Sequence, residues 1–378
     1  MNKHIILAGA AAAALAACSQ DRGITTPRDA AAARLAASAL NASPNPSVAY
    51  TLSNQVTGNA VLTFRRAADG TLTAAAQVAT GGSGTGSGLG SQGALALSAD
   101  GSWLFAVNAG SNDVSTFRVT PAGLALAQRV PSGGTQPISL TVHGSLLYVL
   151  NAGGSGNITG FTVSTDGTLT ALAGSTRPLS GPAVGPAEVA FSPDGGALVV
   201  TEKNTNALDV YAVGPDGIAG GPASRKSAGV QPFGFAFGLR REMFVSEAAS
   251  GSASSYALGA DDRLTLVSGA VATHQGAPCW LVVTQDGRFA YTANARSGTI
   301  SGFAVGSDGS LRLVDANGIT ARVGPGNIDL ALSEDGRYLY QLNGAGSITA
   351  FRVEPDGHLT AVGGVTGLPA GVVGLAAR

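Results

Sequence analysis

The chain has 378 residues, 55 of which are glycine, and only 12% of its residues are charged. So much glycine argues against a helical protein, because glycine lowers helix stability and favours turns. The formal net charge of -1, without a long basic run, excludes the electrostatic surface that nucleic-acid binding requires. The composition instead suits many short strands joined by tight hairpins.

The N-terminus has the pattern of a targeting segment. A short positive start, residues 1–4, precedes the apolar run Ile5–Leu15, which is too short to span a bilayer. The run ends in Leu15-Ala16-Ala17-Cys18, which resembles a lipobox with an acylated cysteine. We therefore expect a signal peptide over 1–17 and a lipidated Cys18 with a flexible tether over 18–47. The alternative is a coincidental cysteine in an alanine-rich stretch.

Ser19 follows the cysteine, where aspartate would retain a Gram-negative lipoprotein in the inner membrane. The sequence thus predicts a protein of the cell envelope, anchored by lipid in the outer membrane and facing the periplasm. Contact with the membrane is expected through this anchor only.

From residue 48 onward a single pattern recurs. Each unit has an apolar strand, an Asp-Gly turn, a strand ending in Asn or Glu, an alternating strand, a second turn and a Leu-Thr-rich strand. Clear copies are SADGSWLFAVNAGSNDVSTF (98–117) and TQDGRFAYTANARSGTISGF (284–303). The end-of-strand residues recur at intervals of 43 to 54 residues: Asn54, Asn108, Asn151, Glu202, Glu247, Asn294 and Asn343. Four-stranded units of this period predict an all-β, seven-bladed β-propeller over residues 48–378.

The ends of the repeat predict how the ring closes. The first unit starts with Val48-Ala49-Tyr50, which matches the second strand of the other units, so it lacks an inner strand. The segment 371–377 matches the inner strands of the other units. We expect this last strand to complete the first blade.

Two rings of side chains are expected at one mouth of the central channel, because the inner and second strands are antiparallel. The first ring comprises Gly374, Ala94, Ser139, Glu188, Gly234, Trp280 and Asp329, and the second is the Asn and Glu series. A residue that recurs in most blades is most simply explained as a cap of the blade itself. The residues that break the repeat are therefore the informative ones: Glu188, Trp280, Asp329, Glu202 and Glu247. Crowded carboxylates there could serve acid–base chemistry or cation binding, or could be paired with nearby arginines.

The connections between blades add further candidates at this mouth. They include His274, the best general base by location, and Arg322. Cys279 lacks an evident base partner and reads as a small buried thiol. The glycine-rich stretch 81–93 does not join a strand to a helix, so we interpret it as a flexible loop between the first two blades. No group of residues has metal-ligand spacing, and neither a metal nor a cofactor is expected.

With these units the chain resembles the bacterial lactonase-type propeller family, which includes 6-phosphogluconolactonases and is related to carboxymuconate cyclases. The resemblance covers residues 48–378 and implies hydrolysis or formation of a sugar-acid or muconate-type lactone at the channel mouth, without a metal. The family's GPRH motif corresponds here to Gly185-Pro186-Ala187-Glu188, and its Asn-Glu to Thr201-Glu202.

The resemblance retains Glu202 but not every residue of the family motif. Ala187 and Glu188 replace the family's Arg and His, and Arg296 lies one place beyond the Asn-Arg position of the sixth blade. These departures argue against a phosphorylated lactone.

Two hypotheses follow. In the first, the protein hydrolyses an extracytoplasmic lactone or ester, with Glu202 positioning water and with Glu188, His274 and Arg296 as secondary catalytic candidates. In the second, it is a non-enzymatic propeller that binds a ligand or an envelope protein. In either case the expected ligand-binding residues are Asp329, Glu247, Trp280, Asn108, Asn151, Asn294, Asn343 and Arg322. The sequence indicates a monomer without a nucleic-acid partner.

Overall fold

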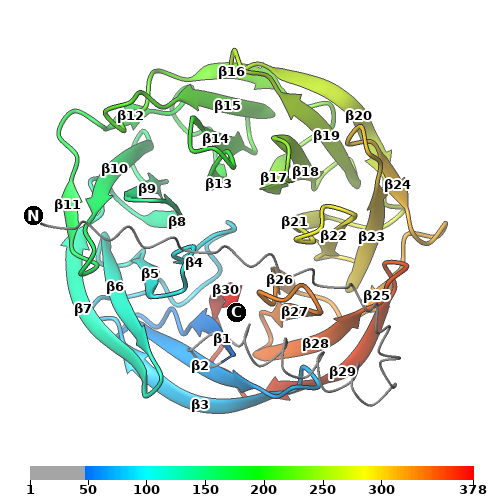
Figure 1. Ribbon diagram of the computed structural model, residues 1–378, viewed down its shortest axis with the longest axis horizontal. Helices are drawn as coiled ribbons and strands as arrows, with labels where there is room; N and C mark the ends of the chain where they lie inside the picture. The colour runs from blue at the N-terminus through cyan, green and yellow to red at the C-terminus, as the bar shows by residue number, and fades with distance from the viewer. Residues whose placement is uncertain (1–46) are drawn as a thin grey trace, which may run out of the picture. The chain divides into compact units, whose positions relative to one another are not determined.

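The computed structural model describes residues 47–378 and contains, within that range, strands and no helix. Seven antiparallel sheets stand around a common centre (Figure 1), so the predicted seven-bladed β-propeller is confirmed. The predicted signal peptide, Cys18 and the tether up to residue 46 lie outside the described residues. No helix in the part of the chain that the structure describes is long and apolar enough to cross a membrane.

The first three blades follow one another around the ring, and in each the strands are ordered from the innermost to the outermost as follows. The first blade contains β30 (Val373–Ala377), β1 (Val48–Leu52), β2 (Ala60–Arg66) and β3 (Leu72–Ala79). The second contains β4 (Leu95–Leu97), β5 (Trp103–Asn108), β6 (Asp113–Thr120) and β7 (Gly123–Pro131). The third contains β8 (Pro137–His143), β9 (Leu146–Asn151), β10 (Asn157–Val163) and β11 (Leu169–Ala171), with β12 (Arg177–Pro178) also paired to β10.

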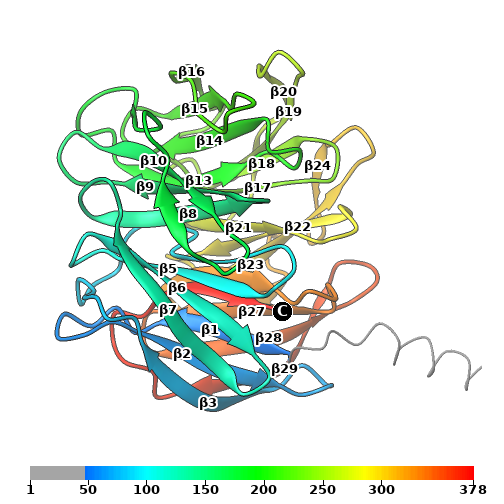
Figure 2. The ribbon, with the colours of Figure 1, turned by 60° about the vertical axis from the view of Figure 1, so that its left-hand side comes forward.

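The remaining four blades have the same order from inner to outer strand. The fourth contains β13 (Pro186–Phe191), β14 (Ala197–Glu202), β15 (Ala207–Ala212) and β16 (Ala223–Lys226), and the fifth β17 (Pro232–Phe237), β18 (Glu242–Glu247), β19 (Ser252–Leu258) and β20 (Leu264–Ala272). The sixth contains β21 (Pro278–Val283), β22 (Phe289–Asn294), β23 (Thr299–Val305) and β24 (Leu311–Leu313), with β25 (Ala321–Arg322) paired to β23. The seventh contains β26 (Asn327–Leu332), β27 (Tyr338–Asn343), β28 (Ser347–Val353) and β29 (Leu359–Thr366). Figure 2 shows the ring obliquely, with the long outer strands β3 and β7 at its front.

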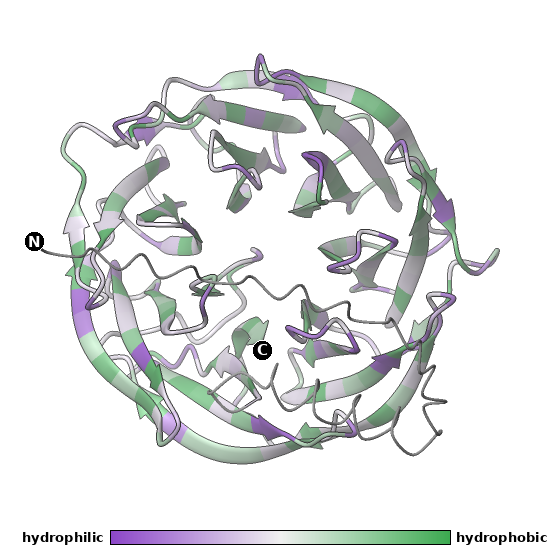
Figure 3. Cartoon of the chain, viewed as in Figure 1, coloured by the Kyte–Doolittle hydropathy of each residue, from purple (hydrophilic) through white to green (hydrophobic). Residues whose placement is uncertain are grey.

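The core lies between the blades. One apolar cluster joins the first three blades, with Leu52 from β1, Leu104 from β5 and Leu147 from β9 all fully buried. Apolar colour accordingly follows the strands, whereas the hydrophilic residues gather mainly in the turns (Figure 3). The second strands, such as β5 and β14, are thus removed from water on both faces by the neighbouring blades, whereas outer strands such as β3 and β7 are largely exposed.

Neighbouring blades also meet through tyrosines and Asp-Gly turns. The hydroxyl of Tyr340 on β27 donates to the carbonyl of Gly70 at 3.0 Å, and Tyr291 donates to Gly357 in the same way at 2.8 Å. Gly70 has a φ of +89°, and a Cβ there would lie 2.1 Å from the ring of Tyr338. The turn therefore requires glycine both for its backbone conformation and for the aromatic ring of the preceding blade.

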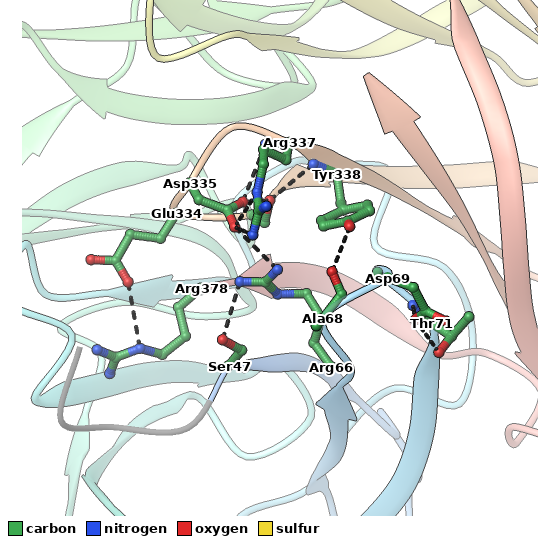
Figure 4. Close-up of polar contacts among 12 residues, drawn as sticks. Ser47, Arg66, Ala68, Asp69, Thr71, Glu334, Asp335, Arg337, Tyr338 and Arg378 are labelled. Atoms are coloured by element: carbon green, nitrogen blue, oxygen red, sulfur yellow. Dashed lines mark hydrogen bonds and ion pairs between the residues drawn. The ribbon is translucent and has the colours of Figure 1, made fainter. Parts of the chain in front are cut away.

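The ring closes as the sequence predicts. Strand β30 pairs antiparallel with β1, with Ala49 opposite Ala377 and Thr51 opposite Leu375. At the seam with the seventh blade, Arg66 of β2 binds Asp335 at 3.2 Å and the hydroxyl of Ser47 at 3.1 Å (Figure 4).

The two faces of the propeller differ. One carries the Asp-Gly turns, such as Asp69-Gly70 and Asp335-Gly336, and is here called the turn face. The other carries the ends of the second strands, at residues such as Glu202 and Asn294, and is here called the loop face. Strand β1 starts at the turn face.

Candidate functional site

The loop face brings the two expected rings together. At the end of β14, Glu202 pairs with Pro186 at the start of β13, and the same register joins Asn294 with Pro278. Residues that are distant along the chain therefore converge at this end of the central channel.

Side chains of the second ring are buried and hold loops. Asn108 donates to Asp113 at 2.6 Å and to Ser115 at 2.8 Å, and accepts from Asn59 at 2.9 Å. The others that the sequence singled out are likewise bonded within their own blade or its connections, namely Asn54, Asn151, Asn294 and Asn343. The asparagines thus cap their blades rather than project into an open mouth.

The two glutamates of this ring follow the same rule. Glu247 is fully buried and accepts hydrogen bonds from the hydroxyls of Ser227, Ser252 and Ser254 and from the N–H of Gly229, at 2.6 to 2.8 Å.

Glu202, also fully buried, accepts from the N–H of Ser180 at 3.0 Å and from the hydroxyls of Ser180 and Thr205. Both carboxylates are thus engaged with the connections that enter their blades, and a catalytic role for Glu202 stays a prediction.

Members of the inner ring bind the next blade. The hydroxyl of Ser139 accepts the N–H of Val189 at 3.2 Å, and the carboxylate of Glu188 accepts the N–H of Phe235 at 2.7 Å. The carboxyl of Asp329 likewise accepts a hydrogen bond from the backbone N–H of Leu375. These side chains satisfy backbone N–H groups on the channel edge of the inner strands, which would otherwise lack partners.

The two acidic groups of the inner ring are electrostatically unusual. Burial raises the pKa of Glu188 well above its ordinary value, the N–H of Phe235 opposes this, and the charge of Asp329 adds to it. Burial likewise raises the pKa of Asp329, against hydrogen bonds from Leu330 and Leu375. Burial thus favours the neutral form of both carboxyls.

The centre of the ring is occupied by the connection between β3 and β4, which enters it from the side of the second blade (Figure 1). The backbone N–H of Gln92 donates to Ala187 of the fourth blade at 3.1 Å. Its side-chain amide both donates to the carbonyl of Leu281 at 2.8 Å and accepts the N–H of Leu281 at 2.9 Å. Ser91 donates to Ile138 of the third blade at 2.8 Å.

Residues 89–93, here called the plug, are thus bonded to the third, fourth and sixth blades. The interpretation of 81–93 as a flexible loop was wrong for this part, because these contacts hold it inside the channel.

Gly234 explains why Gln92 fits. Gly234 is the inner-ring residue of the fifth blade, and a Cβ at this position would lie 2.1 Å from Oε1 of Gln92. The amide of Gln92 thus supplies to Leu281 the acceptor that Glu188 supplies to Phe235. The plug fills the gap that the missing side chain leaves.

Beside the plug, aromatic and basic groups meet. The indole N–H of Trp280 donates to Ser91 at 2.9 Å, and its ring packs edge-on against Phe233 with centroids 5.1 Å apart. The ammonium of Lys203 lies 5.0 Å from the Phe233 centroid and donates to the carbonyl of Gly90 at 2.6 Å. Burial lowers the pKa of Lys203 to about 8, although Cys279 nearby opposes the shift.

A pocket of about 250 Å³ opens on the loop face between the third and fourth blades. Its walls come from the plug, the start of β8, the turn between β9 and β10, the connection that precedes β13, the start of β13 and the turn after β14: Leu89, Ile138, Ala152, Gly154, Ser155, Gly156, Leu179, Ala183, Val184, Gly185, Pro186, Lys203 and Asn204. Lys203 is the one charged residue among these lining residues. The size suits a small molecule with few polar groups.

A model of the family described as lactonase, 7-bladed beta-propeller matches residues 39–184 and 231–329, which is more than half of the chain. The chain belongs to this lactonase family. The stretch between the two matches, 185–230, contains the whole fourth blade, and with it Glu188, Glu202 and Lys203. No curated protein matches the chain.

Solved structures share the fold of this lactonase-family propeller at low sequence identity. A Lactobacillus plantarum protein is 18% identical, with a TM-score of 0.72 over 88% of this chain and 99% of its own. A Bacteroides fragilis protein described as a candidate 6-phosphogluconolactonase is 19% identical, with a TM-score of 0.70 over 89% and 99%. The periplasmic gluconolactonase of Pseudomonas aeruginosa is 22% identical, with a TM-score of 0.68 over 86% and 98%.

The other candidate site residues, His274, Arg322, Arg296 and Cys279, do not line the pocket. His274 is exposed with a φ of +56°, Arg322 is exposed on β25, and Arg296 is exposed just after β22. Cys279 is buried, and burial raises the pKa of its thiol to about 12, although Lys203 and Arg296 oppose this. A buried neutral thiol is what the sequence indicated. Among the described residues, no group of three or more His, Cys, Asp or Glu is placed to hold a metal.

Sequence reasoning missed Lys203 and Gln92. Only Lys203 and Lys226 are lysines within residues 47–378, and Lys203 directly follows the Glu of the family motif, which was a usable signal. Gln92 carried no signal of its own, since its partner Leu281 lies 189 residues away along the chain.

Proposed function

We propose that this protein is an extracytoplasmic lactone hydrolase whose reaction takes place in the 250 Å³ pocket of the loop face. The observation that carries the proposal is Lys203, a partly buried amine with a pKa of about 8 in the wall of that pocket. Gly185 and Pro186 of the family's functional motif line the same pocket. Membership of the lactonase family supports the reaction class.

Lys203 suits the part of a general base. An amine with a pKa near the working pH is neutral often enough to accept a proton and basic enough to activate water. The neutral Nζ takes a proton from water as the water oxygen bonds to the lactone carbonyl carbon. The ring C–O bond of the tetrahedral intermediate then breaks, and the ammonium returns the proton to the leaving alkoxide. The product is the open hydroxy acid.

The pocket favours a compact lactone without a phosphate. Lys203 is its only charged lining residue, and the ammonium already donates to Gly90. A phosphate group usually requires several cationic or N–H donors. We therefore propose a neutral sugar-acid lactone, or a lactone with one carboxylate, as the substrate class.

We further propose that the protein is a lipoprotein anchored through Cys18. Cell fractionation tests the anchor. The full-length protein should be found in the membrane fraction, and the Cys18→Ser variant in the soluble fraction.

The activity test is a panel of lactones, with and without phosphate, assayed with the full-length protein and with Lys203→Met. Loss of a general base lowers kcat/KM by about 10²- to 10⁴-fold. Lys226→Met is the matched control, because Lys226 also donates to one backbone carbonyl, that of Thr205, but does not line the pocket. Equal turnover by Lys203→Met and the native protein would remove Lys203 from the mechanism.

The alternative is a propeller that binds a ligand without converting it. One observation favours it: the plug closes the channel, and Glu202 and Glu247 are committed to loops. No turnover of any lactone, together with saturable binding that Lys203→Met weakens, would support this alternative.

A further inference from the structure

The fourth blade differs from the second, fifth and sixth blades at one position of its third strand. Seven residues after the end-of-strand residue, Ser115, Ser254 and Ser301 each place a hydroxyl against Asn108, Glu247 and Asn294 respectively, at 2.7 to 2.8 Å. In the fourth blade the corresponding residue is Asp209, which is opposite Val200 while Glu202 is opposite Ala207, so Asp209 and Glu202 are diagonal neighbours on one face of the paired strands β14 and β15. The serine hydroxyl accepts from Asn108 and Asn294 and donates to Glu247, so it suits either partner, whereas Asp209 places a carboxyl beside a carboxyl.

Two buried carboxyls side by side require a proton between them. Asp209 and Glu202 are both fully buried. Oδ1 of Asp209 accepts from the hydroxyl of Ser224, whereas its Oδ2 is buried without an N–H or O–H donor. A carboxylate cannot donate, so Asp209 can bond to Glu202 only when it carries the proton itself. Burial, together with its hydrogen bond to Glu202, raises the pKa of Asp209 to about 7.

The groups around the pair supply little positive charge. Tyr211 shares the strand of Asp209, and its phenol donates to the carbonyl of Pro178 at 3.1 Å. Lys226 on β16 donates to the carbonyl of Thr205, and Arg177 on β12 donates to Gly174 and Thr176. Within residues 47–378 no hydrogen bond or ion pair joins a cation to either carboxyl, so a second negative charge here would be uncompensated by these residues.

The pair is connected to the pocket wall. Glu202 accepts both the N–H and the hydroxyl of Ser180. Ser180 lies in the connection 179–185, of which Leu179, Ala183 and Val184 line the pocket, and Lys203 directly follows Glu202. A change in the charge of the pair can therefore reach the pocket wall through the side chain of Glu202, which binds Ser180.

We propose that Asp209 and Glu202 form a proton-controlled latch, which holds the pocket wall 179–185 when they share a proton and releases it when the proton is lost. When Asp209 loses the proton, the two buried carboxylates repel each other. We expect the carboxylate of Glu202 to move away from Asp209 and so to break its hydrogen bonds with Ser180. The effect on catalysis rests on the proposed function, but the latch itself does not.

The test is hydrogen exchange of the full-length protein at pH 6 and pH 8, corrected for the intrinsic effect of pH. A group with a pKa of about 7 changes from about 90% protonated to about 10% over this interval. The protection factor of the peptide over 179–185 is expected to fall about tenfold. The peptide over 226–231 is the internal control, because Glu247 holds Gly229 there with permanent hydroxyl donors.

Two variants make the test decisive. Asp209→Asn keeps the shape and can always donate, so it should retain protection at both pH values. Asp209→Ser introduces the residue that the second, fifth and sixth blades have at this position, and it serves if the first variant folds poorly. A pH-independent protection of 179–185 in the native protein, or an unchanged pH dependence in the folded variants, would overturn the latch. Absence of lactone turnover with a pH-dependent wall would refute the proposed function only.

Discussion

Arg66 of the first blade and Asp335 of the seventh form an ion pair of 3.2 Å across the seam at which the ring closes. The side chain of Arg66 is only 7% exposed, and its guanidinium also lies 5.4 Å from the centroid of the Tyr338 ring. Tyr338 in turn donates to the carbonyl of Ala68 at 2.7 Å (Figure 4). The two ends of the repeat are thus joined on the turn face by side chains as well as by the pairing of β30 with β1.

Replacement of Arg66 by Ala is expected to lower the free energy of unfolding by about 2 kcal/mol, because it removes a largely buried guanidinium together with its bonds to Ser47 and Asp335, although Arg337 still pairs with Asp335. Urea unfolding measures this loss. Arg263→Ala is the control, since Arg263 and Asp261 are 3.6 Å apart with side chains 86% and 66% exposed. An equal effect of the two substitutions would show that the seam pair contributes no more than a surface pair.

Strand β30 should stabilise the whole ring. Leu375 is buried in the cluster that joins the first and seventh blades, so Leu375→Ala is expected to cost about 2 to 5 kcal/mol. Deletion of residues 371–378 should lower the protection of amides in every blade, as followed by hydrogen exchange. If the loss of protection were confined to β1 and β2, closure would be a local feature and not a condition of the fold.

Gln92 of the plug and Gly234 of the fifth blade should be energetically coupled, because the side chain of Gln92 occupies the space beside Gly234. Gln92→Ala leaves the buried N–H and carbonyl of Leu281 without partners and should cost about 1 to 3 kcal/mol. Gly234→Ala should also destabilise the protein, since its Cβ would lie 2.1 Å from Gln92 Oε1 and 2.8 Å from the carbonyl oxygen of Cys279. The double variant should lose less than the sum, because the first clash disappears when Gln92 is shortened. Additive losses in a double-mutant cycle would contradict the contact.

Asp209 predicts how stability changes with pH. Its folded pKa of about 7 lies above the ordinary 3.8, so the folded state holds a proton that the unfolded state releases above about pH 4. The contribution of Asp209 is therefore fully present below pH 4 and is lost as pH rises through about 7. Relative to Asp209→Asn, the native protein should become less stable between pH 5 and pH 8 in urea unfolding. Parallel curves for the two proteins would exclude the shared proton.

Features set by neighbouring residues could be predicted from the sequence, and features set across the ring could not. The Asp-Gly turns and the strand endings at Asn or Glu repeat locally, so blade number and closure followed from them. The plug depends on Gln92 meeting Leu281 and on Gly234 leaving room, which no local pattern reveals. Glu202 was correctly placed at the loop face, but its enclosure by Ser180 and Thr205 became visible only once the connections were in place.

The proposed reaction depends on Lys203 acting as a base in the pocket of the loop face. The most direct measurement is the pH dependence of kcat/KM on a hydrolysed lactone between pH 6 and pH 10, for the native protein and for Lys203→Arg. Because the neutral amine is the active form, the native rate should rise with pH and level off above about 8, the pKa of Lys203. Lys203→Arg, which stays protonated, should show a rate at least about 100-fold lower without that rise. A native profile that is flat through pH 8, or one that Lys203→Arg reproduces, would contradict the account.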